Sequence, residues 1–199
     1  YGHYVTTTDW PHPQASALKM YLHGDRSISD KAPAAGEATN MTLQEPANGV
    51  CSASTSQWTA GAIGLAPTPT PPCMTDDSST EALDVHYETS ALDDDLYING
   101  PIYAEVWAAT TASDAGLAVR VDDVDGATVT PLTTGLQTFS MSTMDLSKSR
   151  LLDGQIIQPW HSFTKEAKVT VTPNSPMKIG VDLPDVSVHM MRRLVHRRL

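Results

Sequence analysis

The sequence has few of the features that mark a membrane-spanning, nucleic-acid-binding or helical protein. Aromatic residues make up only 6% of the 199 residues. No apolar run approaches the roughly 20 residues that a membrane-spanning helix needs. Basic residues are scarce, with 13 Lys and Arg against 23 Asp and Glu and a net charge of −10. This balance argues against nucleic acid as the main partner, because phosphate binding needs an excess of cations. The 14 Pro and 12 Gly indicate a chain rich in loops.

Recognisable catalytic and metal-binding motifs are also missing. No Gly-x-Ser-x-Gly elbow presents a nucleophilic serine, and no spacing pairs a nucleophile with a base. The seven histidines are scattered, and none belongs to the His-Glu-x-x-His or Cys-x-x-Cys pattern of a zinc site. The acidic runs at 93–95 and 122–125 are explained better as turns than as calcium ligands. We therefore predict no catalytic residue, no metal site and no cofactor in this chain.

Only two cysteines are present, Cys51 and Cys73, at the ends of a loop rich in Pro and Thr. A disulfide between them would close a loop of about 20 residues and stabilise the fold by roughly 3 kcal/mol in the chain-entropy model. We predict this disulfide because such a loop has little else to hold its ends; the alternative is two unrelated buried thiols. If the cysteines pair, the protein is secreted or in the cell envelope, and otherwise it is cytoplasmic.

Residues 83–132 show the clearest alternation of apolar and polar side chains, which is typical of strands in an antiparallel sheet. In 100–108, one face of a predicted strand carries Ile102, Ala104, Val106 and Ala108. The opposite face carries Tyr103, Glu105 and Trp107. Asp125-Gly126 separates two further alternating runs and predicts a hairpin, because Gly accepts a positive φ at no steric cost.

Other alternating runs predict strands in 16–23, 135–143, 168–172 and 176–183, with polar connection in 145–153. Counted together, the predicted strands number about eight, at the spacing expected of a β-sandwich or jelly roll. The basic segment 184–199 is open to two interpretations, an amphipathic helix or a turn and strand, of which we favour the second. The predicted fold class is all-β.

Residues 83–102, LDVHYETSALDDDLYINGPI, resemble the opening of the central sheet in the C-terminal domain of X-Pro dipeptidyl-peptidases and cocaine-esterase-like (CocE/NonD) serine hydrolases. In that family an aromatic-x-Thr-x-x-Leu run leads to a Gly-Pro, as 87–92 leads to Gly100-Pro101 here. Similar segments follow at 106–108, at the 122–126 hairpin and at Trp160-His161. The resemblance covers roughly residues 18–199 and is strongest in 83–136.

The resemblance implies a galactose-binding-like jelly-roll β-sandwich that follows an α/β-hydrolase domain carrying a Ser-His-Asp triad. The jelly-roll domain itself is non-catalytic, and no position of this chain matches the family's catalytic motifs. We expect residues 1–15 to be the connection from a missing hydrolase domain and residues 16–199 to be the jelly-roll domain. We also expect its last strand to be cut short at Leu199. A shortened strand would expose a sheet edge, which favours a homo-oligomer.

The predicted function is that of an accessory domain in a serine hydrolase, either an X-Pro dipeptidyl-peptidase or an acyl esterase. It would pack on the hydrolase domain and shape the pocket for a peptide or ester substrate. The alternative is a free-standing carbohydrate-binding module, since one fold can host unrelated sites. A small complete enzyme is the weakest interpretation. The residues predicted for a domain-contact or ligand surface are Tyr97, Tyr103, Trp107 and Trp160.

Overall fold

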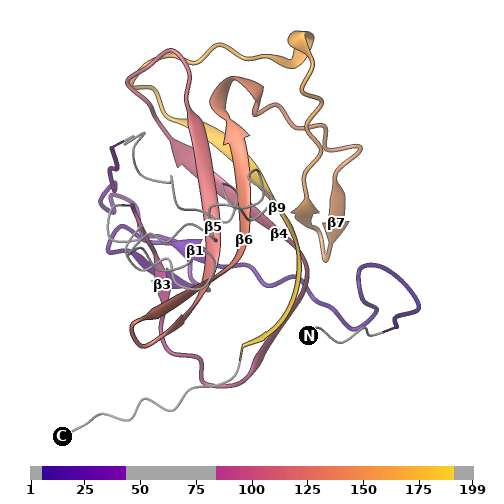
Figure 1. The fold of residues 1–199 in the computed structure, drawn as a ribbon. Helices are drawn as coiled ribbons and strands as arrows, with labels where there is room; N and C mark the ends of the chain where they lie inside the picture. The colour runs from indigo at the N-terminus through magenta and orange to yellow at the C-terminus, as the bar shows by residue number, and fades with distance from the viewer. Residues whose placement is uncertain (1–5, 44–83, 191–199) are drawn as a thin grey trace, which may run out of the picture. The chain divides into compact units, whose positions relative to one another are not determined.

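The computed structural model describes residues 6–43 and 84–190 (Figure 1). In these ranges the regular structure consists of nine strands, β1–β9, and two short 3-10 helices, η2 and η3. The fold class is therefore all-β, as predicted. No helix in the same ranges is long and apolar enough to cross a membrane. The predicted pair Cys51 and Cys73 lies outside the described residues.

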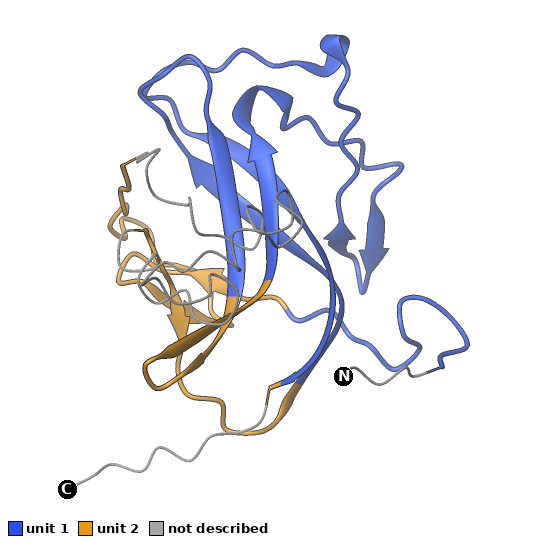
Figure 2. Cartoon of the chain, in the orientation of Figure 1, with its two compact units in different colours: residues 1–18, 97–121, 133–189 blue, residues 19–96, 122–132, 190–199 orange. Residues whose placement is uncertain are grey.

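The chain divides into two compact units, which Figure 2 colours separately. Unit 1 comprises Tyr1–Leu18, Tyr97–Val121 and Thr133–His189. Unit 2 comprises Lys19–Leu96, Asp122–Leu132 and Met190–Leu199. Each unit is described separately below.

Two long strand pairs contribute most of their residues to unit 1 (Figure 1). Strand β4 (Leu96–Ala108) pairs with β9 (Met177–Met190). Strand β5 (Gly116–Asp125) pairs with β6 (Thr128–Thr138). The helix η2 (Phe139–Met141) follows β6, and η3 (Lys165–Ala167) lies in the connection to β9. Strand β9 extends to Met190, which confirms the strand interpretation for 184–190.

The core of unit 1 lies between residues of these strands. Its buried members are Phe139, Val171, Ile179, Val181 and Leu183. Ile179, Val181 and Leu183 are at most 1% exposed, because alternate residues of β9 point to the same face. Partly buried residues packed against them are Ile102, Ala104, Ala108, Ala115, Leu117, Val119, Val121 and Met177. Ile102, Ala104 and Ala108 belong to one face of the alternation predicted for 100–108, and they pack together against this core.

Two hairpins each turn at an Asp-Gly pair. The β5–β6 hairpin turns at Gly126, whose φ is +61°, as the sequence predicted. The antiparallel hairpin of β7 (Arg150–Leu152) and β8 (Gln155–Gln158) turns at Asp153 and Gly154, with φ of +51° and +76°. The prediction of polar connection in 145–153 was wrong for this second hairpin. Its strands are too short to show alternation.

Unit 2 contains a small sheet in the order β1-β2-β3. Strand β1 (Tyr21–Leu22) pairs antiparallel with β2 (Ser27–Ser29), which pairs parallel with β3 (Glu88–Thr89). The strand predicted over 16–23 is thus only two residues long.

Two further strand predictions also need correction, both in unit 1. The strand predicted over 135–143 ends at Thr138, where η2 begins, because the backbone carbonyl of Phe139 bonds to the N–H of Ser142. The strand predicted over 168–172 is extended chain without a strand partner in the described ranges. Its backbone is held locally instead: the Val169 N–H donates to the Ser140 carbonyl at 2.8 Å.

Candidate functional site

Several large apolar side chains in the segment 144–163 of unit 1 are at least half exposed to water. They are Leu146, Leu151, Trp160 and Phe163, with exposed fractions of 61%, 52%, 50% and 59%. Together we call these four side chains the Trp160 surface. Covering an apolar side chain of this size is favourable by about 1.5–3 kcal/mol. These four residues are candidates for contact with another protein part, because exposed apolar area that forms one patch marks such a surface.

Hydrogen bonds hold the backbone of Trp160 on both sides. The Trp160 N–H donates to the Ser149 hydroxyl at 3.0 Å, and the Trp160 carbonyl accepts from the Asp145 N–H at 2.9 Å. The Ser149 hydroxyl in turn donates to the Asp145 carbonyl at 2.9 Å. The ammonium of Lys148 lies 6.0 Å from the centre of the indole ring, within reach of a cation–π interaction. The exposed ring is thus presented on a fixed backbone.

The turn that carries these contacts is organised by the carboxylate of Asp145. Its Oδ1 accepts from the N–H and the hydroxyl of Ser147, at 3.0 and 2.6 Å. Its Oδ2 lies 3.2 Å from the ammonium of Lys148. The Ser147 hydroxyl and then Lys148 lower the pKa of Asp145, so the carboxylate is ionised at neutral pH.

His161 directly follows Trp160 in the sequence and is only 9% exposed. Its Nδ1 lies 3.2 Å from the Thr143 carbonyl, so Nδ1 carries the proton and donates. Nε2 is buried without a hydrogen-bond partner among the described residues. The ring also contacts Phe163, with 5.5 Å between ring centres. This environment supports a structural role for His161.

Three of the four residues predicted for a domain-contact or ligand surface are at least half exposed. Tyr97 and Trp107 on β4 are each 69% exposed, and Trp160 belongs to the surface described above. The ring of Tyr97 stacks on His189 of β9, with 3.9 Å between centres and 11° between planes. One face of the Tyr97 ring is therefore already covered.

Tyr103, the fourth predicted residue, is half-buried and faces polar neighbours within unit 1. Its hydroxyl donates to Glu105 Oε2 at 3.3 Å and lies 3.7 Å from the sulfur of Met144. Burial, followed by the charge of Glu105, raises the pKa of Tyr103 to about 12. Glu105 is also 3.3 Å from the ammonium of Lys178. The Tyr103 hydroxyl is thus engaged within its own unit.

Sequence reasoning missed three members of the Trp160 surface, Leu146, Leu151 and Phe163. The available signal was the pair Leu151-Leu152 immediately before Asp153-Gly154. In a short hairpin, adjacent residues point to opposite faces, so one of two neighbouring leucines must face outward. Leu151 is exposed and Leu152 is partly buried, in agreement with this rule.

Within 6–43 and 84–190, no group of three or more His, Cys, Asp or Glu side chains is arranged to hold a metal ion. The arrangement in segment 144–163 offers apolar area on a fixed backbone, which suits contact with another protein part.

Comparison with known proteins identifies the kind of molecule that carries such a domain. The family model described as the X-Pro dipeptidyl-peptidase C-terminal non-catalytic domain matches residues 2–191. No curated protein sequence matches the chain closely enough to serve as a relative.

Solved structures with a similar fold come from a bacterium and an archaeon. A CocE/NonD family hydrolase from Staphylococcus aureus is 15% identical, with a TM-score of 0.61 over 96% of this chain and 30% of that chain. An aminopeptidase from a marine sediment Thaumarchaeota archaeon is 19% identical, with a TM-score of 0.61 over 94% of this chain and 29% of that chain. This chain therefore spans less than a third of either protein. Since the family model matches almost its whole length, the chain belongs to the family of X-Pro dipeptidyl-peptidase C-terminal non-catalytic domains, as its sequence predicted.

Proposed function

We propose that this chain is the accessory domain of a serine hydrolase, an X-Pro dipeptidyl-peptidase or an acyl esterase. In this role it packs against an α/β-hydrolase domain and helps to shape the substrate pocket. The observation that carries the proposal is the family match over residues 2–191, in a chain that covers 30% of a structurally similar hydrolase. The remaining length of such a protein leaves room for a separate catalytic domain.

The Trp160 surface supports the packing part of the proposal. Its four side chains are exposed in the chain alone, and the backbone of Trp160 is held by Ser149 and Asp145. A fixed backbone costs little further conformational entropy when a partner covers the side chains. The occupant that we propose is the hydrolase domain of the same protein.

The proposed fold subtype is a galactose-binding-like jelly roll. The two strand pairs of unit 1, β4–β9 and β5–β6, contribute residues to one common core. A common core supports the proposal, because the inward faces of paired strands bury each other in a sandwich.

A comparison of the chain alone with the full-length protein that contains it tests the proposal. The chain alone should not hydrolyse a proline-containing dipeptidyl amide, and the full-length protein should. Trp160→Ser should lower the unfolding temperature of the full-length protein, because the indole is covered only there, and leave that of the chain alone nearly unchanged. Leu136→Ser is the control, since Leu136 on β6 is 70% exposed and belongs neither to the Trp160 surface nor to the predicted contact residues.

Turnover of the dipeptidyl amide by the purified chain alone would overturn the proposal. Specific binding on a glycan array, with Tyr97 or Trp107 required, would favour the carbohydrate-binding module instead.

A further inference from the structure

The described segment before β1, residues 6–18, belongs to unit 1 and is attached to it at two points (Figure 2). Near its end, the Ala17 N–H donates to Asp153 Oδ2 at 3.0 Å. Asp153 lies in the turn between β7 and β8, 136 residues further along the chain. Nearer its start, Trp10 lies over Gly100 of β4, with its Cη2 3.9 Å from the place that a Cβ of Gly100 would take. Both attachments join residues that are distant in the sequence.

The attachment at Trp10 removes apolar surface from water. Trp10 is 37% exposed, so most of its ring is covered, and Gly100 is buried. Large aromatic rings bury more area than other side chains and dominate the energetics of such contacts. The indole therefore supplies most of the stabilisation, whereas the directional bond between Ala17 and Asp153 fixes the path of the backbone.

The chain between the two attachments is also ordered by its own sequence. The Ala15 N–H donates to the His12 carbonyl at 2.8 Å, which closes a turn. Pro11 and Pro13 reduce the entropy that is lost on ordering, because each ring already fixes φ in the unfolded chain. The segment thus follows a defined path along unit 1.

The attachment at Asp153 lies on the hairpin that carries part of the Trp160 surface. Leu151, a member of that surface, belongs to β7, which leads directly into Asp153. One short hairpin therefore presents an apolar side chain to solvent and holds the end of the segment.

We propose that residues 10–17 are a strap that fixes the orientation of the α/β-hydrolase domain on this chain, with Asp153 as the positioning residue that anchors the strap. The inference rests on the proposed function, because it takes the domain on the N-terminal side of the strap to be the hydrolase domain. A domain that is joined through an anchored segment samples fewer orientations than one joined through a free linker. The strap therefore raises the effective concentration of the hydrolase face that covers the Trp160 surface.

Hydrogen exchange at the Ala17 amide of the 199-residue chain tests the strap itself. Asp153→Gly removes the carboxylate, and glycine adopts the φ of +51° in this turn without strain. We expect the Ala17 amide to exchange about 10-fold faster in this variant, because a hydrogen bond to a carboxylate is stronger than one to a neutral acceptor. Asn174→Gly is the matched control. It also introduces glycine at a positive φ, +60°, and no hydrogen bond joins Asn174 to residues 6–18 in the described structure.

Trp10→Ala removes the other attachment without touching the hairpin. The Ala17 amide should again exchange faster, because the two attachments hold one segment, and the amides of β7 and β8 should keep their rates. Trp107→Ala controls for the loss of an indole, since Trp107 is 69% exposed. Unchanged exchange at Ala17 in either Asp153→Gly or Trp10→Ala would overturn the strap.

Small-angle X-ray scattering of the full-length protein that contains this chain tests the orienting role. Asp153→Gly should increase the radius of gyration, because the hydrolase domain is then less restricted, and Asn174→Gly should leave it unchanged. An unchanged radius in Asp153→Gly, in a protein that still hydrolyses a dipeptidyl amide or a short-chain ester, would overturn the orienting role and leave the proposed function standing. Absence of hydrolysis by the unchanged full-length protein would instead contradict the proposed function.

Discussion

At the scale of single residues, Gly135 is the position in unit 1 with the least room for a side chain. A Cβ at Gly135 would collide with the Asp182 carbonyl and lie 2.9 Å from Val181 Cγ1, both on β9. Because the carbonyl belongs to the backbone, the clash cannot be relieved by a rotamer change. We expect Gly135→Ala to lower the free energy of unfolding by about 1–3 kcal/mol, the usual cost of overpacking.

The control is Gly116→Ala, at the start of β5. Nothing lies within 4 Å of a Cβ built there, so this change should be neutral or slightly stabilising. Denaturant unfolding of both variants measures the difference, and equal effects at the two sites would contradict the packing of Gly135 against β9.

Tyr103 gives a prediction about alkaline pH. Its pKa is raised to about 12, above the ordinary value of 10.0, so the folded state holds the phenolic proton more tightly than the unfolded state does. The stability that this proton contributes is present below about pH 10 and is lost as the pH rises towards 12. Tyr103→Phe should therefore lose less stability than the unchanged chain between these pH values.

Urea unfolding at a series of alkaline pH values measures this effect. Tyr97→Phe is the control, because its side chain is 69% exposed. Identical pH dependence in Tyr103→Phe and the unchanged chain would contradict the burial of the Tyr103 hydroxyl.

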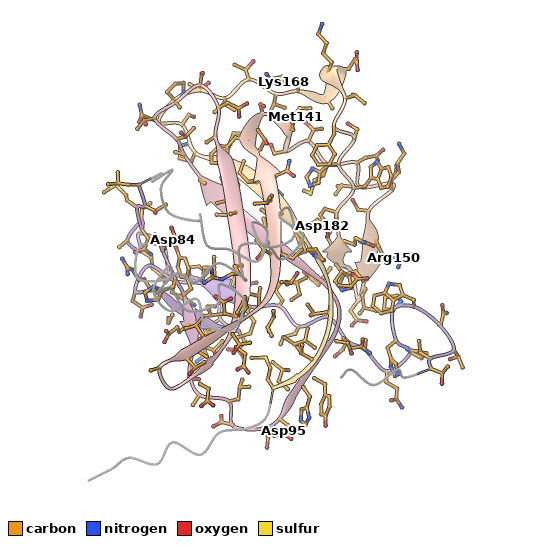
Figure 3. The ribbon with its side chains drawn as sticks, in the orientation of Figure 1. Asp84, Asp95, Met141, Arg150, Lys168 and Asp182 are labelled. Atoms are coloured by element: carbon orange, nitrogen blue, oxygen red, sulfur yellow. The ribbon has the colours of Figure 1, made fainter. Side chains whose placement is uncertain are left out.

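At the scale of elements, Asp114 joins the start of β5 to η2. Its Oδ1 accepts from the N–H groups of Ala115 and Ser140, at 2.9 and 3.0 Å, and its Oδ2 accepts from the Ser140 hydroxyl at 2.5 Å. Figure 3 shows Met141 and Lys168 near each other at this end of unit 1, where Lys168 adds a favourable charge. The Ser140 hydroxyl is the main cause of the lowered pKa of Asp114.

A lowered carboxyl pKa stabilises the fold above the unfolded value of about 3.9, and this stability is lost as the pH falls through the folded value. Asp114→Asn should thus lower the stability of the chain at pH 7. In acid, below the ordinary pKa of a carboxyl group, the stability of the variant should differ less from that of the unchanged chain. Asp94→Asn, in the exposed turn before β4, controls for the loss of one surface charge. Thermal unfolding at both pH values provides the measurement, and an equal effect at each pH would argue against the Asp114 contacts.

Alternation of apolar and polar residues predicted the long strands β4 and β5, because a long strand repeats this signal several times. Apolar residues of both strands pack against the core of unit 1. At the end of β6 the pattern misleads, since Leu136 is 70% exposed and Gln137 is 4% exposed. The Gln137 amide donates to the Met141 carbonyl at 2.7 Å, four residues further on in η2, and this bond makes burial of a polar side chain possible.

The hydrogen bonds from His23 of unit 2 to Ser29 and Glu37 could not be predicted from the sequence, for a different reason. His23 and Ser29 are brought together by the pairing of β1 and β2, and Glu37 returns from a connection without periodicity. No spacing rule links these three positions. The Trp160 surface was predicted only at Trp160, because exposure of a leucine depends on which face of a short hairpin is covered.

At the scale of the whole molecule, the proposed accessory role makes Trp160 a reporter of the hydrolase domain. Its indole is 50% exposed in the chain alone and would be covered in the full-length protein. Acrylamide should therefore quench Trp160 fluorescence more strongly in the chain alone. The difference between each protein and its Trp160→Phe variant isolates this signal from the other three tryptophans. Equal quenching in both proteins would show that the hydrolase domain does not cover Trp160.

The parallel pairing of β2 with β3 has an evolutionary consequence. Ser27 lies opposite Glu88, and Ile28 lies opposite Thr89, so the two strands keep their register although a long stretch of sequence separates them. The entropy of closing such a connection grows only with the logarithm of its length, by about 0.6 kcal/mol for each doubling. Insertions or deletions between β2 and β3 should therefore change the stability of the fold little. We expect related proteins to differ in length at this connection.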